Sequence, residues 1–210
     1  MSFLDDLVKE RRSIRRYRAE TPPSAWIEQM VLTASQAPSS GNSRPVRFIR
    51  ITSPPVKTAL YEAMEAGRRR FLQAAAMSEE PKRLRNWINA YYRFSEFMFH
   101  APVLMAVGTV DILSGFSNRL SEAGFIIPGG RMKTDIDIAV GLALEGFILK
   151  GQELDLGSCI LTAPLVFISD IEEIIGVKEE KIKCFVTVGF PDEKPPARKR
   201  KAIGDIYREI

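Results

Sequence analysis

Apolar residues recur at helical spacing in two segments of the chain. After Ser24, the residues Ile27, Met30 and Ala34 fall on one face of a helix. Residues 135–153 are apolar on nearly every face, and a helix of this kind must be buried on all sides. The pattern therefore predicts an amphipathic helix after Ser24 and a long central helix at 135–153. We expect the central helix to lie at an interface between subunits.

Three other segments have the pattern of β-strands. Residues 46–52, 103–110 and 182–190 are rich in β-branched and aromatic residues or form short apolar runs. The first of them is followed by Pro54, a residue favoured in the first turn of a helix, and we expect that helix to continue to about Ala66. The mixture predicts an α+β fold in which helices flank a central mixed or antiparallel sheet.

The chain shows no internal repeat and no linker before residue 190. We therefore expect residues 1–190 to form a single domain. Residues 191–210 are polar, charged and rich in proline, which is typical of an extended C-terminal arm. This arm would pack on the same domain or on a partner subunit. Between residues 111 and 131, glycine and serine are frequent, and the pair Gly129-Gly130 predicts a turn within a loop.

An aromatic stripe and a capping pattern stand out in the rest of the chain. Trp87, Tyr91 and Phe94 would share one face of a helix, either as core or interface packing or as a lid over a planar ligand. Ser169 with Glu172 is typical of a capping box at the start of a short helix. Neither feature by itself indicates a chemistry.

Composition excludes several classes of protein. In the 210 residues, 45% are hydrophobic and 27% are charged, as in an ordinary globular protein. The single histidine, His100, and the distant Cys159 and Cys184 do not form a metal-ligand pattern or an iron–sulfur motif. Both cysteines lie in apolar runs, which indicates buried thiols in a reducing, cytoplasmic compartment. Early acidic residues argue against a signal peptide, and the apolar run Ala101–Val110 is too short to span a bilayer.

The net charge of +4 is concentrated in two distant clusters. One is Arg11-Arg12-Ser13-Ile14-Arg15, and the other is Arg198-Lys199-Arg200-Lys201. A guanidinium group binds phosphate with two parallel, charge-assisted hydrogen bonds, so both clusters could converge on one anionic ligand. A solvated basic face is the simpler interpretation. A nucleic-acid-binding domain is a third, but the net charge is modest and no nucleic-acid-binding motif is recognised.

A polar loop separates the first predicted helix from the first predicted strand. It reads Pro38-Ser39-Ser40-Gly41-Asn42-Ser43-Arg44-Pro45 and combines hydroxyl and amide groups with a flexible glycine. By itself this composition predicts only a turn. The loop comes about 25 residues after the arginine segment, and this order of the two motifs indicates more than a turn.

The ordered set of motifs resembles the flavin-dependent nitroreductase family. The resemblance rests on the arginine segment with Tyr17 behind it, the loop Pro38–Pro45 leading into a strand, and two further motifs. These are the glycine-containing turn Leu156-Gly157-Ser158-Cys159 after the long helix, and Val188-Gly189-Phe190-Pro191 before the basic arm. The resemblance covers about residues 2–65 and 134–207, and residues 67–133 match poorly.

This resemblance implies FMN as the cofactor, with no metal, and a homodimer with shared sites. Arg11, Ser13, Arg198 and Arg200 would hold the FMN phosphate, with help from Arg12. Arg15 would lie at the pyrimidine edge of the flavin ring, where a cation stabilises the reduced, anionic form. The remaining cofactor contacts that the resemblance implies are Pro38, Ser39, Ser40 and Asn42 from the partner subunit, and the backbone at Thr162 and Ala163 next to the flavin N5.

The implied activity is an FMN-dependent oxidoreductase. It would pass hydride or electrons from NAD(P)H to a nitroaromatic, a quinone or a similar planar acceptor by a ping-pong mechanism. Because the flavin carries the chemistry, no catalytic side chain is required. A member of the family with other chemistry, such as reductive dehalogenation, flavin fragmentation or no turnover, is the alternative. The family usually has Gln-Pro-Trp where this chain has Arg44-Pro45-Val46, so we expect the packing of this loop to differ.

Overall fold

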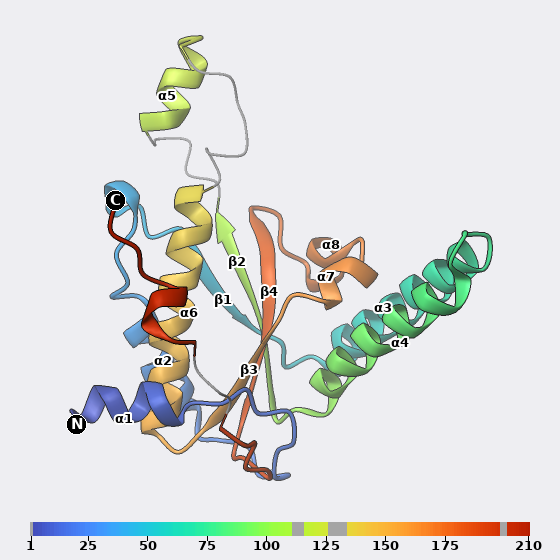
Figure 1. Ribbon diagram of the computed structural model, residues 1–210, viewed down its shortest axis with the longest axis horizontal. Helices are drawn as coiled ribbons and strands as arrows, with labels where there is room; N and C mark the ends of the chain where they lie inside the picture. The colour runs from blue at the N-terminus through green and yellow to red at the C-terminus, as the bar shows by residue number, and fades with distance from the viewer. Residues whose placement is uncertain (1, 111–115, 126–133, 198–200) are drawn as a thin grey trace.

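A four-stranded antiparallel sheet forms the centre of the protein in the computed structural model, which describes residues 2–110, 116–125, 134–197 and 201–210 (Figure 1). The strand order is β1-β2-β4-β3, and every neighbouring pair is antiparallel. The predicted α+β class with a central sheet is therefore confirmed. The strands are β1 (Val46–Arg50), β2 (Val103–Val110), β3 (Gly157–Leu161) and β4 (Glu180–Gly189).

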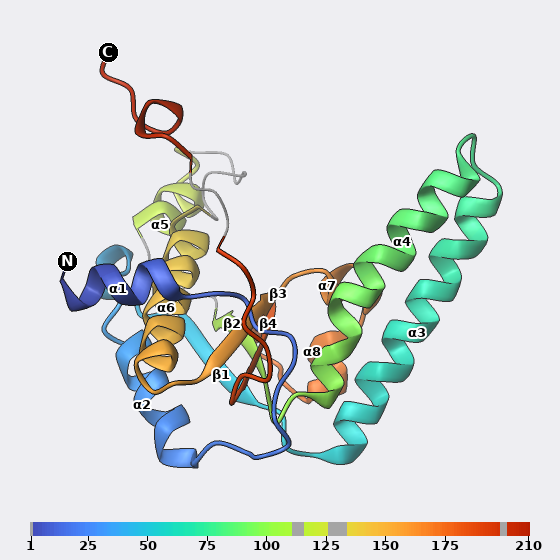
Figure 2. The ribbon, with the colours of Figure 1, turned by 60° about the horizontal axis from the view of Figure 1, so that its bottom comes forward.

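Helices cover both faces of this sheet (Figures 1 and 2). One side carries α1 (Phe3–Glu10), α2 (Ser24–Ala34) and α6 (Thr134–Glu153). The other carries α3 (Pro54–Ala76), α4 (Pro81–Glu96), α7 (Pro164–Phe167) and α8 (Ile171–Ile175). The α3–α4 hairpin projects well beyond the sheet in both views. The remaining helices are α5 (Phe116–Glu122) and the short 3₁₀ turns η1 (Ser40–Asn42), η2 (Phe97–His100) and η4 (Ile203–Asp205).

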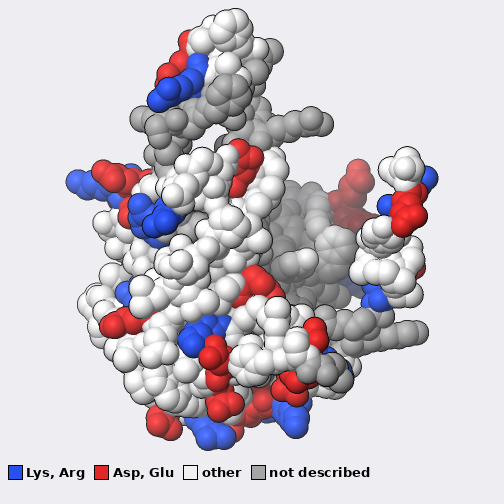
Figure 3. Space-filling model, turned by 90° about the vertical axis from the view of Figure 1, so that its left-hand side faces the viewer, with Lys and Arg blue, Asp and Glu red and all other residues white. Residues whose placement is uncertain are grey.

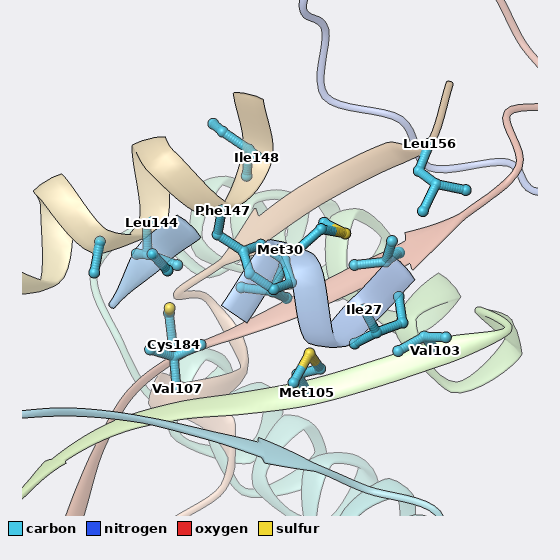
Figure 4. Close-up of a cluster of buried hydrophobic side chains, with 14 of the residues drawn as sticks. Ile27, Met30, Val103, Met105, Val107, Leu144, Phe147, Ile148, Leu156 and Cys184 are labelled. Carbon is cyan, nitrogen blue, oxygen red and sulfur yellow. The ribbon is translucent and has the colours of Figure 1, made fainter. Parts of the chain in front are cut away.

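Alternation along the central strand β2 creates two separate cores. Val103, Met105 and Val107 point toward α2 and α6 and pack there with Met30, Phe147 and Ile148, as Figure 4 shows. Leu104 and Ala106 point to the opposite face, against the α3 and α7 side. Successive side chains of a strand face opposite sides of a sheet, so a strand covered on both faces is apolar throughout. This explains why 103–110 reads as a continuous apolar run.

Both cysteines are buried, one in each core, as their apolar surroundings predicted. Cys184 packs on the α2–α6 side and Cys159 on the other. Burial disfavours the thiolate and raises the pKa of Cys184 to about 12. This thiol therefore remains protonated and unreactive at neutral pH.

Three local features differ from the sequence-based expectations. The helix that begins at Pro54 continues to Ala76 instead of ending near Ala66. The motif at Gly157 opens the edge strand β3, which the sequence analysis did not predict. The capping box was wrong, because Asp170 is the N-cap of α8 and makes no side-chain cap. Instead, the Glu172 carboxylate accepts a hydrogen bond from the backbone N–H of Ile182 at 3.1 Å and ties α8 to β4.

The aromatic stripe lies on one helix but is not part of the core of this chain. On α4, Trp87, Tyr91 and Phe94 are 51%, 61% and 61% exposed. Interface packing or a lid therefore remain the two interpretations. In the loop expected at 111–131, the structure contains helix α5, whereas Gly129-Gly130 lies outside the described residues. Among the described helices, none is long and apolar enough to cross a membrane.

Candidate functional site

The arginine segment leaves α1 and runs along the outer edge of the sheet. Ser13 pairs with Ser158 of β3 in a parallel bridge, and the Ile14 N–H donates to the Ser158 carbonyl at 3.0 Å. The segment can come this close because residue 157 is glycine: a Cβ there would lie 2.6 Å from Cγ1 of Ile14. The motif at Gly157 and the arginine motif are thus two sides of one contact.

Tyr17 fixes the far end of the segment. Its hydroxyl donates to the Ile14 carbonyl and lies 2.8 Å from Oγ1 of the buried Thr187. Burial raises the pKa of the Tyr17 phenol well above its usual range, so the hydroxyl remains protonated and available as a donor. The ring packs on Gly189, where a Cβ would lie 2.8 Å from its Cδ1 atom. The aromatic residue of the motif is therefore structural.

The beginning of the C-terminal arm holds the same segment from the other side. The Arg18 N–H donates to the Phe190 carbonyl at 2.9 Å, and the Asp192 N–H donates to the Arg16 carbonyl at 3.0 Å. The Glu193 carboxylate accepts hydrogen bonds from the backbone N–H groups of both Arg15 and Arg16. Sequence analysis missed this role of Glu193, because nothing in the sequence pairs residues that are so far apart in the chain.

Arg11, Ser13 and Arg15 gather around the buried thiol of Cys159. Burial raises the pKa of this thiol, and the negative charge of Glu193 acts in the same direction. The positive charge of Arg15, a hydrogen bond with Ser13 and the charge of Arg11 act in the opposite direction. Within the described residues, neither Arg11 nor Arg15 forms an ion pair with a carboxylate. Two cations and a hydroxyl at the edge of β3 therefore form a local site suited to an anion.

Arg12 of the same motif turns back toward α1. Its Nη1 donates to the carbonyl groups of Lys9 and Arg11, each at 2.7 Å. Carbonyl groups at the end of a helix have no partner within the helix, so this guanidinium satisfies them. Its Nε is buried without a hydrogen-bond partner in the described structure. Arg12 thus holds the helix end from which the segment leaves.

The polar loop Pro38–Pro45 is braced by its own side chains. Ser39 Oγ accepts from the Arg44 backbone N–H at 2.9 Å, and Asn42 Oδ1 accepts from Arg44 Nε at 3.2 Å. Arg44 adopts a left-handed conformation with φ of 49°, which is uncommon for a residue with a side chain. Ser40 is exposed. Arg44, the departure from the usual family sequence, thus shapes the loop directly.

This loop forms one wall of a cavity of about 380 Å³. The cavity is lined by apolar residues of α2, β1 and the first half of α6, with Pro38, Ser39, Arg44 and Arg47 from the loop and the start of β1. Ser13, by contrast, pairs with Ser158 of β3, the strand that comes after the C-terminal end of α6. The two predicted parts of the site therefore lie toward opposite ends of α6 within one chain (Figure 1).

The other predicted site residues follow β3 or lie in the arm. Thr162 is exposed and Ala163 half-buried in the turn between β3 and α7, where their carbonyl groups accept from Leu165 and Val166 at 3.1 Å each. Arg198 and Arg200 lie outside the described residues. Within the described residues, no group of three or more His, Cys, Asp or Glu side chains could hold a metal ion.

Two named proteins are similar to this chain along nearly its whole length. Iodotyrosine deiodinase of Thermotoga neapolitana is 26% identical over 207 residues, covering 97% of this chain and 96% of the relative. YfhC of Bacillus subtilis, provisionally named an NAD(P)H nitroreductase, is 26% identical over 210 residues, covering 100% of this chain and 95% of the relative.

Solved structures share the fold. A BluB-like flavoprotein of Clostridium difficile superposes with a TM-score of 0.79 at 21% identity, covering 100% of both chains. An oxidized iodotyrosine deiodinase bound to FMN and 3-iodo-L-tyrosine has a TM-score of 0.69 at 24% identity, covering 98% of both chains. The FMN in that structure agrees with the cofactor that the resemblance implied. The model of the nitroreductase family matches residues 8–190, from α1 through the arginine segment to the end of the sheet, and the chain therefore belongs to this family.

Proposed function

We propose that this protein is an FMN-dependent oxidoreductase that transfers electrons from NAD(P)H to a planar, electron-poor acceptor such as a nitroaromatic or a quinone. The observation that carries the proposal is the group of Arg11, Ser13 and Arg15 at the edge of β3. The side chains of its two arginines form no ion pair with a carboxylate within the described residues. Membership of the nitroreductase family supports the same cofactor.

The residues present fit the FMN phosphate. Arg11 supplies a planar pair of donors and Ser13 a hydroxyl, which together suit the oxygen atoms of a phosphate group. The backbone beneath them is held by β3 through Ser158, so the donors do not have to be ordered when the ligand binds.

Bound FMN would supply the redox chemistry by accepting a hydride and passing electrons on. This chain's residues then have binding and electrostatic roles. Arg15 would keep a positive charge beside the pyrimidine edge of the ring, where negative charge develops on reduction. The backbone N–H groups at Thr162 and Ala163 would orient the ring at its N5 atom. No proton-transferring side chain is assigned to this chain.

We propose a homodimer in which each site takes residues from both chains. Pro38, Ser39, Ser40 and Asn42 lie toward the opposite end of α6 from Ser13, so a second copy would have to bring them to the cofactor. The cavity beside the loop would then face the partner subunit. The expectation of cofactor contacts shared between two chains is thus consistent with the geometry of a single chain.

An exposed apolar face provides a surface for this partner. Figure 3 shows the side of the molecule that carries α1, α2 and α6, and residues other than Lys, Arg, Asp and Glu make up much of its surface. Obligate interfaces between subunits are large and apolar. The exposed apolar side chains on these three helices are Phe3, Leu4, Val8, Leu32, Ile138 and Leu142.

The C-terminal arm offers a second surface that could contact the partner subunit. Residues 201–210 are all exposed in the single chain, including the apolar Ile203, Ile206 and Tyr207. We propose that residues 1–190 form the FMN-binding domain and that the end of the arm packs on the second subunit. The arm would then bring Arg198 and Arg200 close to the phosphate of a bound FMN.

Reductive dehalogenation is the second candidate reaction. Its support is the similarity to iodotyrosine deiodinases along nearly the whole chain, as with the Thermotoga neapolitana relative. Both reactions would use the same cofactor and the same arginine segment. They would differ in the acceptor, and the exposed aromatic stripe of α4 is a candidate surface for covering it.

Two measurements test the function. The absorbance spectrum of the purified protein, or of protein mixed with FMN, should show the bands of a bound flavin. Steady-state oxidation of NADH or NADPH should then be stimulated by a nitroaromatic or a quinone and less by 3-iodo-L-tyrosine. Release of iodide from 3-iodo-L-tyrosine under reducing conditions, without nitroreduction, would support the second candidate. Failure to bind FMN would contradict both.

A further inference from the structure

The arginine segment is held by two separate backbone pairings with a gap between them. Ser13 and Ile14 pair with β3 at Ser158. Further along, Tyr17 pairs with Pro191 in an antiparallel bridge. The N–H groups of Arg15 and Arg16 lie between these two pairings, and both are taken by one acceptor, the carboxylate of Glu193.

We propose that Glu193 positions the whole arginine segment for the anionic ligand. It binds the backbone N–H groups of Arg15 and Arg16 and leaves the Arg15 side chain free. This inference rests on the proposed function, because the ligand is FMN. Glu193 belongs to the C-terminal arm, so the arm would act on the site through a described residue, besides any contact made by its basic cluster. Glu193 itself would not touch the ligand.

The distribution of charge around Glu193 supports this role. The Glu193 side chain is 19% exposed, and its carboxylate forms an ion pair with Arg16, at 3.6 Å from Nε. The Arg15 side chain forms no ion pair with a carboxylate within the described residues. The Arg16 side chain is 74% exposed, and exposed ion pairs contribute little. The two hydrogen bonds from backbone N–H groups to a carboxylate are stronger, because the acceptor is charged. Glu193 therefore acts mainly on the backbone.

The neighbouring acid provides a matched control. Asp192 is exposed, and its side chain makes no hydrogen bond or ion pair within the described structure. Its backbone N–H donates a hydrogen bond to the Arg16 carbonyl. Asp192→Ala removes the same negative charge one residue away while it keeps this backbone pairing. Long-range electrostatics would affect both positions, whereas positioning of the backbone would affect only Glu193.

The test compares Glu193→Ala, Glu193→Gln, Arg16→Gln and Asp192→Ala in two measurements. The first is the hydrogen exchange of the Arg15 and Arg16 amides, measured by NMR on the protein without added FMN. The second is the Kd for FMN from the quenching of flavin fluorescence. The glutamine at 193 keeps a carbonyl acceptor but loses the charge, so it should restore part of what alanine removes.

We expect Glu193→Ala to accelerate exchange at both amides at least tenfold and to weaken FMN binding at least tenfold. Glu193→Gln should be intermediate, and Arg16→Gln and Asp192→Ala should stay within about twofold of the parent. The proposal is overturned if Glu193→Ala leaves either quantity within twofold, or if Asp192→Ala has the same effect. A parent protein that shows slow exchange at both amides and no FMN binding would instead overturn the proposed function.

Discussion

The side chain of Ile14 occupies the place that a Cβ atom at residue 157 would need. An alanine there would bring its Cβ to 2.6 Å from Cγ1 and 2.7 Å from Cβ of Ile14. Ile14 is buried, and its own N–H is bonded to Ser158, so the segment cannot yield without losing that hydrogen bond. Gly157 thus determines how closely the arginine segment approaches β3.

Gly157→Ala should therefore weaken FMN binding beyond its effect on stability. Overpacking of this kind costs about 1–3 kcal/mol. The matched variant is Gly67→Ala, whose Cβ would collide with the carbonyl of Phe167 on the other side of the sheet. Both variants should lower the melting temperature, but only Gly157→Ala should raise the Kd for FMN measured well below that temperature. Equal Kd values for the two variants would contradict the assigned position of the segment.

Arg11→Ala should weaken FMN binding by about 1.5–3 kcal/mol, or one to two orders of magnitude in Kd, because a charge-assisted contact to phosphate is lost. Arg18→Ala serves as the control, since the Arg18 side chain is exposed and only its backbone N–H bonds to Phe190. Isothermal titration of the apoprotein with FMN measures both. An unchanged Kd for Arg11→Ala would remove this residue from the phosphate site.

Arg15→Gln should lower the reduction potential of the bound flavin while most of the FMN is retained. The positive charge beside the pyrimidine edge interacts mainly with the reduced, anionic ring. For a two-electron couple, about 30 mV corresponds to about 1.4 kcal/mol, so we expect a decrease of several tens of millivolts. A spectroelectrochemical titration of the loaded variant measures the midpoint. The same midpoint as in the parent would show that Arg15 does not tune the flavin.

Steady-state kinetics should follow a ping-pong scheme. One flavin serves both the nicotinamide donor and the acceptor, so the oxidised donor must leave before the acceptor stacks on the ring. Double-reciprocal plots at several fixed acceptor concentrations should give parallel lines. Lines that intersect to the left of the vertical axis would indicate a ternary complex and a second binding surface.

Leu142→Asp should dissociate the proposed dimer and release FMN with it. Leu142 is an exposed apolar residue on α6, and a buried, unpaired carboxylate at a subunit interface is strongly unfavourable. Val166→Asp, at an exposed apolar position on α7, is the control. Sedimentation velocity with detection of flavin absorbance measures both properties together. A variant that sediments as the parent does, or a monomer that retains FMN, would contradict the shared site.

Much of this architecture could be predicted from local patterns alone. The helix after Ser24, the strands at 46–50 and 103–110, and the long helix at 134–153 each bury a continuous face, and the spacing of apolar residues records that burial directly. The arginine segment was also recognisable, since Ser13 and its neighbours combine residue types that suit phosphate. Each of these features depends on residues that are close together in the sequence.

The contacts that assemble the site could not be predicted in this way. Ser13 meets Ser158, Tyr17 meets Thr187, and the backbone of Arg15 meets Glu193, each across most of the chain. Such pairs are determined by the order of strands in the sheet and by where the arm returns to it, and no local periodicity records them. For the same reason the strand at Gly157 was not predicted. It pairs with the arginine segment on one side and with β4 on the other, and both partners are distant in the sequence.

The sequence by itself determined which chemical groups this protein carries. Only the tertiary structure decided that, within the described residues, the side chains of Arg11 and Arg15 form no ion pair with a carboxylate, while Arg12 satisfies a helix end and Arg16 pairs with Glu193.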